Sequence, residues 1–163
     1  MNKIFFAKAI QDGLGNYIRI WMENITKNFD PCEIIDLSEV YKQINEDEKE
    51  ISLLSSSKRE YKIYEGEWRS WEDLYFYEKK YFFPLIDSCD IMVSAEAWNH
   101  PRRGKYTAKV IVEMEYGLAI GKKVFGINIE DWTFKEITKE DLLKIKNEKE
   151  NEIVFLDFLR RSL

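Results

Sequence analysis

Glu113 is the ionisable side chain whose setting in the sequence most favours chemistry. A helix is expected at about 108–120, apolar on nearly all sides, and at about 100° per residue Glu113 falls at the edge of its apolar arc. A carboxylate in that setting is costly unless it is paired or has a function. Lys109, four residues earlier, could form a simple ion pair with it, although Lys before Glu is the weaker order. The spacing alone leaves a functional carboxylate and a plain ion pair equally open.

A polar loop at 96–105 is the second candidate, because it follows a strand expected at 91–95. Trp98 has the flat ring needed to stack on a base, and Asn99 has the amide needed to read its edge. Guanidinium and ammonium groups bind phosphate, and the loop carries Arg102, Arg103 and Lys105. A solvated basic loop is the alternative, and we expect at least one of these side chains to contact a ligand.

Two further patterns favour structural roles. Gly13 and Gly15 precede a helix, but Ile18 stands where a dinucleotide-binding fingerprint needs a third Gly, so a flexible loop is favoured over a phosphate loop. The aromatic run from Trp68 to Phe83 has helical spacing, which predicts core packing. It holds more rings than one helix face can bury, so part of it is expected in a dimer contact or a lid.

Residue counts exclude several classes of site. The chain has 163 residues, a formal net charge of -5, one His and two Cys. A single imidazole, His100, excludes HExxH and any multi-histidine metal site, and His100 is expected to be an exposed loop residue. The sequence has neither GxSxG nor GxxxxGK followed by Ser or Thr, so it carries no nucleophile elbow and no P-loop. We therefore expect no metal and no cofactor.

Composition and charge also limit the partners and the compartment. The acidic balance argues against general nucleic-acid binding, and no apolar run approaches the roughly 20 residues of a membrane span. No small-residue cleavage site follows the first apolar run, so a signal peptide is not expected. Cys32 and Cys89 belong to no CxxC pair, which favours reduced core thiols in a cytoplasmic protein.

Short apolar strands alternate with amphipathic helices along the chain. Strands are expected at 3–7, 33–37, 91–95 and 123–129, with helices at about 17–29, 68–86, 108–120 and 138–161. This order predicts a single α/β domain over 1–163, with a flavodoxin-like doubly wound sheet, mainly parallel, of four to five strands and helices on both faces. Residues at about 42–66 are expected to form a polar insertion or loop.

A doubly wound sheet binds ligands at the carboxyl ends of its strands, where the strand order reverses. In a flavodoxin-like order that point lies between the first and third strands. The residues that frame it here are Ala7, Lys8 and Ala9 after the first strand, and those from Ser94 through Glu96 to Trp98 after the third. The fold therefore predicts ligand contacts from these two strand ends.

The segment that begins at Glu113 resembles the signature of nucleoside 2-deoxyribosyltransferase-like proteins. In that family a catalytic Glu opens a helical segment that runs through a Tyr to Gly-Lys and the next strand, and the matching residues are Glu113, Tyr116, Gly121 and Lys122. The run 3–7 looks like the family's first strand, and 87–93 looks like its lead-in to a later strand. The sequence departs from the family at Glu115, where Gly is common.

TIR-like domains are a second family that the sequence resembles. They have the same kind of fold and a catalytic Glu on the equivalent helix, in a pattern similar to Val110–Glu113 followed by Gly121 and a strand. The N-terminal run favours the deoxyribosyltransferase-like family, whereas the loop before Glu113 favours the TIR-like domains. Both resemblances imply cleavage of an N-glycosidic bond, in which a carboxylate stabilises the oxocarbenium charge or bonds to the anomeric carbon.

We therefore expect an enzyme that cleaves or exchanges the N-glycosidic bond of a nucleoside or nucleotide, with Glu113 as the catalytic residue. The expected substrate-binding residues are Phe6, Ala7, Lys8, Ser94, Glu96, Trp98, Asn99, Arg102, Arg103 and Tyr116. Two alternatives stay open: a TIR-like NAD hydrolase, and a non-catalytic nucleotide-binding or sensor module. The expected partners are a small nucleoside or nucleotide and a second copy of the chain, in a homodimer or larger.

Overall fold

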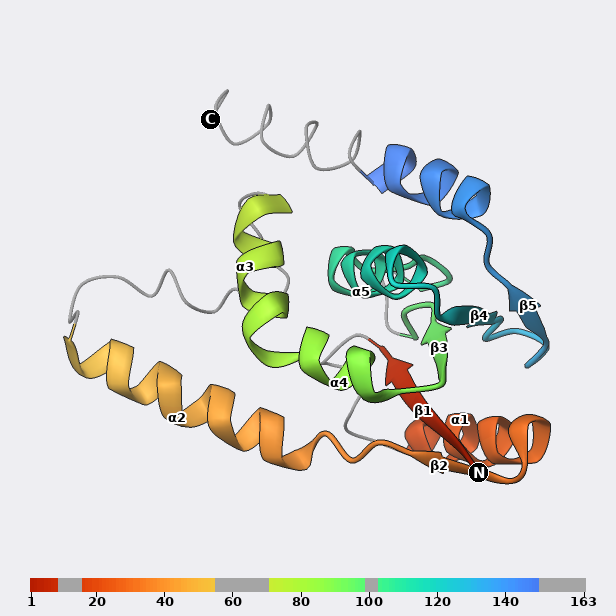
Figure 1. The fold of residues 1–163 in the computed structure, drawn as a ribbon, viewed down its shortest axis with the longest axis horizontal. Helices are drawn as coiled ribbons and strands as arrows, with labels where there is room; N and C mark the ends of the chain where they lie inside the picture. The colour runs from red at the N-terminus through yellow and green to blue at the C-terminus, as the bar shows by residue number, and fades with distance from the viewer. Residues whose placement is uncertain (9–15, 55–70, 99–102, 150–163) are drawn as a thin grey trace.

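A five-stranded sheet organises the protein, for which this computed structural model describes residues 1–8, 16–54, 71–98 and 103–149. Its strands are β1 (Asn2–Ala7), β2 (Cys32–Ile34), β3 (Ile91–Ala95), β4 (Lys123–Ile127) and β5 (Phe134–Glu136). They lie in the order β2-β1-β3-β4-β5, with β1 to β4 parallel and β5 antiparallel to β4 (Figure 1). The predicted flavodoxin-like α/β fold is confirmed, with the reversal of strand order between β1 and β3.

Helices cover both faces of this sheet. On one face lies α1 (Asn16–Phe29), and on the other lie α4 (Phe83–Ser88) and α5 (Ala108–Ala119) (Figure 1). The remaining helices are α2 (Ser38–Leu54), α3 (Trp71–Tyr81) and a helical segment at 139–149. In Figure 1, α2 leads away from the sheet and α3 packs beside α4 and α5.

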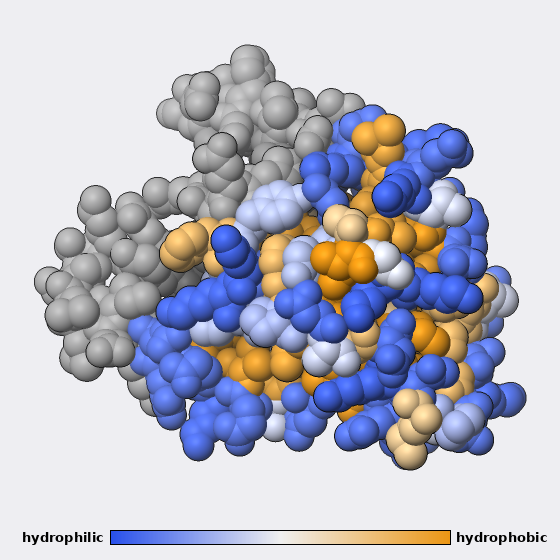
Figure 2. Space-filling model, in the orientation of Figure 1, coloured by the Kyte–Doolittle hydropathy of each residue, from blue (hydrophilic) through white to orange (hydrophobic). Residues whose placement is uncertain are grey.

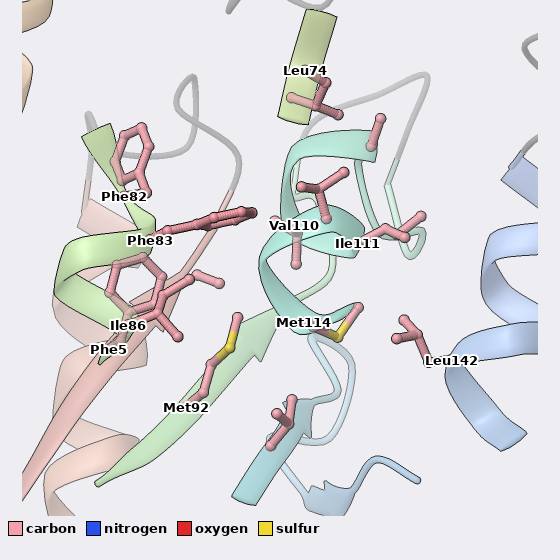
Figure 3. Close-up of a cluster of buried hydrophobic side chains, with 14 of the residues drawn as sticks. Phe5, Leu74, Phe82, Phe83, Ile86, Met92, Val110, Ile111, Met114 and Leu142 are labelled. Carbon is pink, nitrogen blue, oxygen red and sulfur yellow. The ribbon is translucent and has the colours of Figure 1, made fainter. Parts of the chain in front are cut away.

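The alternation of side chains along each strand explains why helices cover both faces. Along β1, Ile4 and Phe6 pack with α1, whereas Phe5 packs toward α4 and α5, because successive side chains of a strand point to opposite faces. Figure 3 shows Phe5 and Met92 of the sheet close to the apolar side chains of α4 and α5. Full burial of a side chain of this size stabilises the fold by about 1.5–3 kcal/mol.

The cap residues define the two ends of α5. The Thr107 side chain accepts a hydrogen bond from the Val110 N–H at 3.5 Å, which satisfies one of the unpaired donors of the first turn. At the other end Gly121 has a φ of 83°, and the Lys122 N–H donates to the Gly117 carbonyl at 2.8 Å. Both caps confirm the helix predicted from the sequence, so the position of Glu113 on it is well defined.

Gly121→Ala should lower the free energy of unfolding by about 1 kcal/mol, because an L side chain disfavours the left-handed conformation. The added methyl group would meet no atom within 4 Å, so the loss would be conformational alone. Gly121→Asn is the matched control and should lose less, since Asn tolerates a positive φ. Urea unfolding measures both, and equal stability of Gly121→Ala and wild type would contradict the prediction.

Two segments differ from the sequence-based expectations. The helix expected at 68–86 is divided into α3 and α4 at Phe82, because Pro84 lacks the N–H needed to continue a helix and suits a first turn instead. Of the polar insertion or loop expected at about 42–66, the residues up to Leu54 are helical and belong to α2, and residues 55–66 lie outside the described residues. Three apolar side chains anchor that helix on the core at helical spacing, namely Val40, Tyr41 and Ile44.

The described surface is largely polar. Figure 2 shows hydrophilic side chains over most of one face, with apolar side chains in patches between them. Within the described helices, none is long and apolar enough to cross a membrane. Cys32 and Cys89 are both free thiols, and Cys89 is buried as predicted, whereas Cys32 is only half-buried.

Candidate functional site

Three buried ionisable side chains from two helices meet beneath the surface. Lys109 and Glu113 lie one turn apart on α5, and the Lys109 Nζ is 2.7 Å from the Glu113 Oε1. The same Nζ is 3.7 Å from the Glu78 Oε1 of α3. The exposed fractions of Glu78 and Glu113 are 0%, and that of Lys109 is 5%. The ion pair that the sequence offered for Glu113 therefore exists, but it is buried and shared with a second carboxylate.

This Glu78–Lys109–Glu113 cluster lies near the carboxyl end of β1. Lys8, the residue after β1, is close enough for its charge to act on Glu113. Its Nζ also donates a hydrogen bond to the Tyr41 Oη of α2 at 3.4 Å. The cluster is therefore beside one of the two strand ends that frame the point where the strand order reverses, the edge at which such folds bind ligands.

Burial and charge act in opposite directions on the groups of the cluster. Burial raises the pKa of Glu78 well above its usual range, and the nearby charge of Glu113 raises it further. Burial also raises the pKa of Glu113, against the opposing effect of Lys109 and, more weakly, Lys8. For Lys109, burial alone would lower the pKa, but the charges of Glu113 and Glu78 outweigh it and raise it. The lysine therefore stays charged.

The cluster leaves carboxylate oxygens without a usual partner. Both oxygens of Glu78 and the Oε2 of Glu113 are buried and accept no hydrogen bond from an N–H or O–H of the described residues. A buried acceptor left in this way typically costs about 1–3 kcal/mol, and more if it is charged. Apolar side chains of similar volume at these positions would avoid this cost.

Sheet residues near the cluster include Ala7 and Ser94, which are paired in register between β1 and β3. Both are buried, and both lie on the face covered by α5, since Ala7 belongs to that core and Ser94 is two residues from Met92. The Ser94 Oγ is buried with no hydrogen-bond partner among the described residues. Of the expected binding residues, Ala7 and Ser94 thus lie on the sheet face that α5 covers. Lys8 acts on Glu113 of that helix from the end of β1.

Phe6 and Trp98 lie in the core on the other face of the sheet. Phe6 is 2% exposed and makes an edge contact with Trp21 at 5.6 Å between ring centroids. The Trp98 ring stacks on Trp132 at 5.9 Å, and the Arg103 guanidinium lies 4.3 Å from its centroid. The structure therefore does not bring these two rings or Arg103 together with Glu113, and a base could stack on Trp98 only by competing with those contacts.

Glu96 lines a separate surface cavity of about 360 Å³. Tyr106 and Asn128 are among its other lining residues, and Glu113 is not. Partial burial raises the pKa of Glu96, and the charges of Glu130 and Asp131 act in the same direction. Glu96 is thus near the carboxyl end of β3 but belongs to a different hollow from the cluster.

Tyr116 lies away from the carboxyl ends of the strands. Its ring stacks on Phe83 of α4 at 3.9 Å, and its hydroxyl donates a hydrogen bond to the Asp87 carboxylate, which precedes β3. Its ring and hydroxyl are therefore engaged with α4 rather than with the Lys109–Glu113 pair. Two further expected binding residues, Asn99 and Arg102, lie outside the described residues, as do Gly13, Gly15, Trp68 and His100.

Glu78 is the functional candidate that sequence reasoning missed. A signal for it exists, because Leu74 and Phe82 lie four residues to either side and are fully buried, so the intervening helical position faces the core as well. The aromatic composition of this stretch drew attention to its rings rather than to the one carboxylate among them.

Neither family models, nor curated proteins, nor solved structures give a match to this chain. Its class therefore follows from the geometry: a flavodoxin-like α/β protein with a buried cluster of two carboxylates and a lysine near the β1 strand end. Among residues 1–8, 16–54, 71–98 and 103–149, no three His, Cys, Asp or Glu side chains gather so as to hold a metal ion.

Proposed function

We propose that this protein cleaves or exchanges the N-glycosidic bond of a nucleoside or nucleotide, with the Glu113 carboxylate as the nucleophile. The observation that carries the proposal is the setting of Glu113. It is fully buried near the carboxyl end of β1, 2.7 Å from a charged lysine and close to a second carboxylate, with one oxygen free of hydrogen bonds from the described residues. Enzymes that cleave glycosidic bonds use two carboxyl groups in different environments, one of which stabilises the oxocarbenium charge or bonds to the anomeric carbon.

The chemistry takes place in two steps. A Glu113 carboxylate oxygen bonds to the anomeric carbon as the bond from that carbon to the base nitrogen breaks; the departing base keeps the electron pair of that bond and takes a proton from water, which leaves hydroxide. A second base or a water molecule then bonds to the anomeric carbon, loses a proton, and returns the electron pair to the carboxylate. Exchange and hydrolysis differ only in whether a base or a water molecule attacks the anomeric carbon in the second step, so Glu113 has the same role in both reactions.

Substrate entry requires a change in the side chains that cover Glu113, since none of its surface is exposed. Lys8 and Tyr41 approach the cluster from β1 and α2, and they contact each other through a hydrogen bond of 3.4 Å and through the Tyr41 ring, whose centroid is 5.5 Å from the Lys8 Nζ. We therefore expect ligand binding to displace this pair before the anomeric carbon reaches the carboxylate.

A non-catalytic nucleotide-binding module is the second candidate, and the zero exposure of Glu113 favours it. On that alternative, the Lys109–Glu113 pair is a structural contact and ligands bind elsewhere along the strand ends. A TIR-like NAD hydrolase remains within the first proposal, since it differs in substrate rather than in the role of the carboxylate. The two candidates predict opposite results in one assay.

Base release is the experiment that separates them. The protein would be incubated with deoxynucleosides, deoxynucleotides, ribonucleotides and NAD, each with and without a second free base, and the products separated by chromatography. Release of base, or exchange when a second base is present, is the expected result, and the productive substrate identifies the class. No release from any of them, together with thermal stabilisation by a nucleotide, would instead support the binding module.

Self-association is also expected, as a homodimer or larger. One supporting feature is Phe76 of α3, a large ring that is 76% exposed. Analytical ultracentrifugation of wild type and Phe76→Ser tests this: the variant should shift toward monomer, and a wild type that sediments as a monomer at all concentrations would contradict it.

A further inference from the structure

We propose that Glu78 is a positioning residue which holds a proton in the buried cluster and thereby leaves Glu113 ionised, an inference that rests on the proposed role of Glu113 as nucleophile. The two carboxylates and Lys109 form a dry site in which one positive charge faces two acids. A single shared proton gives the three groups a net charge of zero, which is the state that burial favours.

The geometry decides which acid is protonated. The Lys109 Nζ is 2.7 Å from a Glu113 oxygen but 3.7 Å from the nearest Glu78 oxygen, so the direct hydrogen bond goes to Glu113. Lys8 adds a second positive charge on the side of Glu113. A negative charge is therefore better stabilised on Glu113, and the proton is better placed on Glu78.

The remaining neighbours of the cluster are consistent with this assignment. From α2, Tyr41 keeps its hydroxyl proton, because burial raises its pKa. The other close contact of Lys109 is apolar, since its Nζ lies 3.9 Å from the centroid of the Phe82 ring. The charges with the largest effects on Glu78 and Glu113 are those within the cluster and that of Lys8, which lies after β1.

A proton on Glu78 also removes the difficulty of the unpaired oxygens. The two carboxyl groups are close enough for a side-chain hydrogen bond, so the O–H of a protonated Glu78 can donate to a Glu113 oxygen. The nucleophile is then held from two sides, by the Lys109 ammonium and by the Glu78 hydroxyl. Glu78 thus acts through Glu113 rather than on the substrate.

Stability as a function of pH tests the assignment without any substrate. A carboxyl whose pKa is raised on folding contributes stability that is fully present below its unfolded pKa, about 4.3, and is lost as the pH rises through its folded pKa. The free energy of unfolding of the wild type should therefore decrease as the pH rises above about 5. Glu78→Gln resembles the protonated acid and should lose this decrease, whereas Glu115→Gln on the same helix should keep it.

A comparison of the two amide variants tells which acid holds the proton. Near pH 7, the folding equilibrium constant of Glu78→Gln should be within about threefold of the wild-type value, because a neutral amide replaces a neutral carboxylic acid. Glu113→Gln should lower that constant by about 100-fold or more, because it removes the close partner of a buried ammonium group. The reverse ranking would place the proton on Glu113 and overturn the proposal.

Infrared spectroscopy supplies a direct readout of the proton. Wild type at about pH 8 should show the carbonyl stretch of a protonated carboxylic acid, and Glu78→Gln should lack it. Absence of this band in wild type, with equal destabilisation by both amide variants, would mean that both acids are ionised and would overturn the proposal. If the band is present but base release is not, the proton assignment stands and the proposed function fails.

Discussion

Glu113→Gln should reduce base release by about 10³-fold or more at saturating substrate. The amide oxygen has nearly the shape of the carboxylate but carries no negative charge, so it can neither bond to the anomeric carbon nor stabilise the oxocarbenium charge. Both steps of the proposed reaction depend on that one group. The measurement is single-turnover base release with the substrate found to be productive for the wild type.

Loss of folding must be separated from loss of chemistry in this experiment. Glu113→Gln also removes the partner of buried Lys109, so the assay needs a temperature at which circular dichroism shows the variant to be folded. Glu115→Gln is the matched control, because Glu115 lies on the same helix but its side chain is a third exposed. Its Oε2 is 2.8 Å from the Lys146 Nζ. This substitution should leave base release unchanged. A folded Glu113→Gln protein with wild-type turnover would exclude Glu113 as the nucleophile.

Lys109→Met should lower the free energy of unfolding by about 3–5 kcal/mol, the usual loss when one partner of a buried ion pair is removed. The methionine fills a similar volume, so the loss reflects charge rather than a cavity. The ionised Glu113 then remains buried beside Glu78, with no ammonium group to balance its charge. Chemical denaturation at about pH 7 measures the effect, and the loss should shrink at lower pH, where the acids take up protons.

The triple variant Lys109→Met, Glu78→Leu and Glu113→Leu should recover most of that stability. Buried ion clusters are often replaced by apolar side chains of similar volume without loss, because the cost of removing the charges from water disappears. Recovery would mean that the fold does not need the cluster, which strengthens the case for a role in function. A triple variant less stable than Lys109→Met alone would show instead that the charges hold the helices together.

The sequence predicted most reliably those elements whose signals are local. The strand expected at 91–95 matches β3 residue for residue, because a run that is apolar except for Ser94 lies there between polar segments. The helix expected at 108–120 matches α5 to within one residue, because Thr107 caps its start and Gly121 ends it. Local signals of this kind, repeated along the chain, predicted the alternating strands and helices of the fold and the helix on which Glu113 lies.

The site was less predictable, because its members are distant in sequence. Glu78 lies 35 residues before Glu113 and on a different helix, and no local spacing relates the two. The sheet face on which each strand residue lies could be predicted, because successive side chains of a strand alternate between the two faces. Phe6 and Ala7 must therefore point to opposite sides of the sheet. Treating both as contacts of one substrate overlooked that constraint, and the structure puts them in different cores.

The two ends of the sheet have a consequence for behaviour in concentrated solution. The outermost strands β2 and β5 have three residues each, and β5 carries the exposed charged side chains of Lys135 and Glu136. Short, charged outer strands are poor templates for another chain, whereas long flat ones invite aggregation. We therefore expect copies of this protein to associate through helix surfaces rather than by extending the sheet from one molecule to the next.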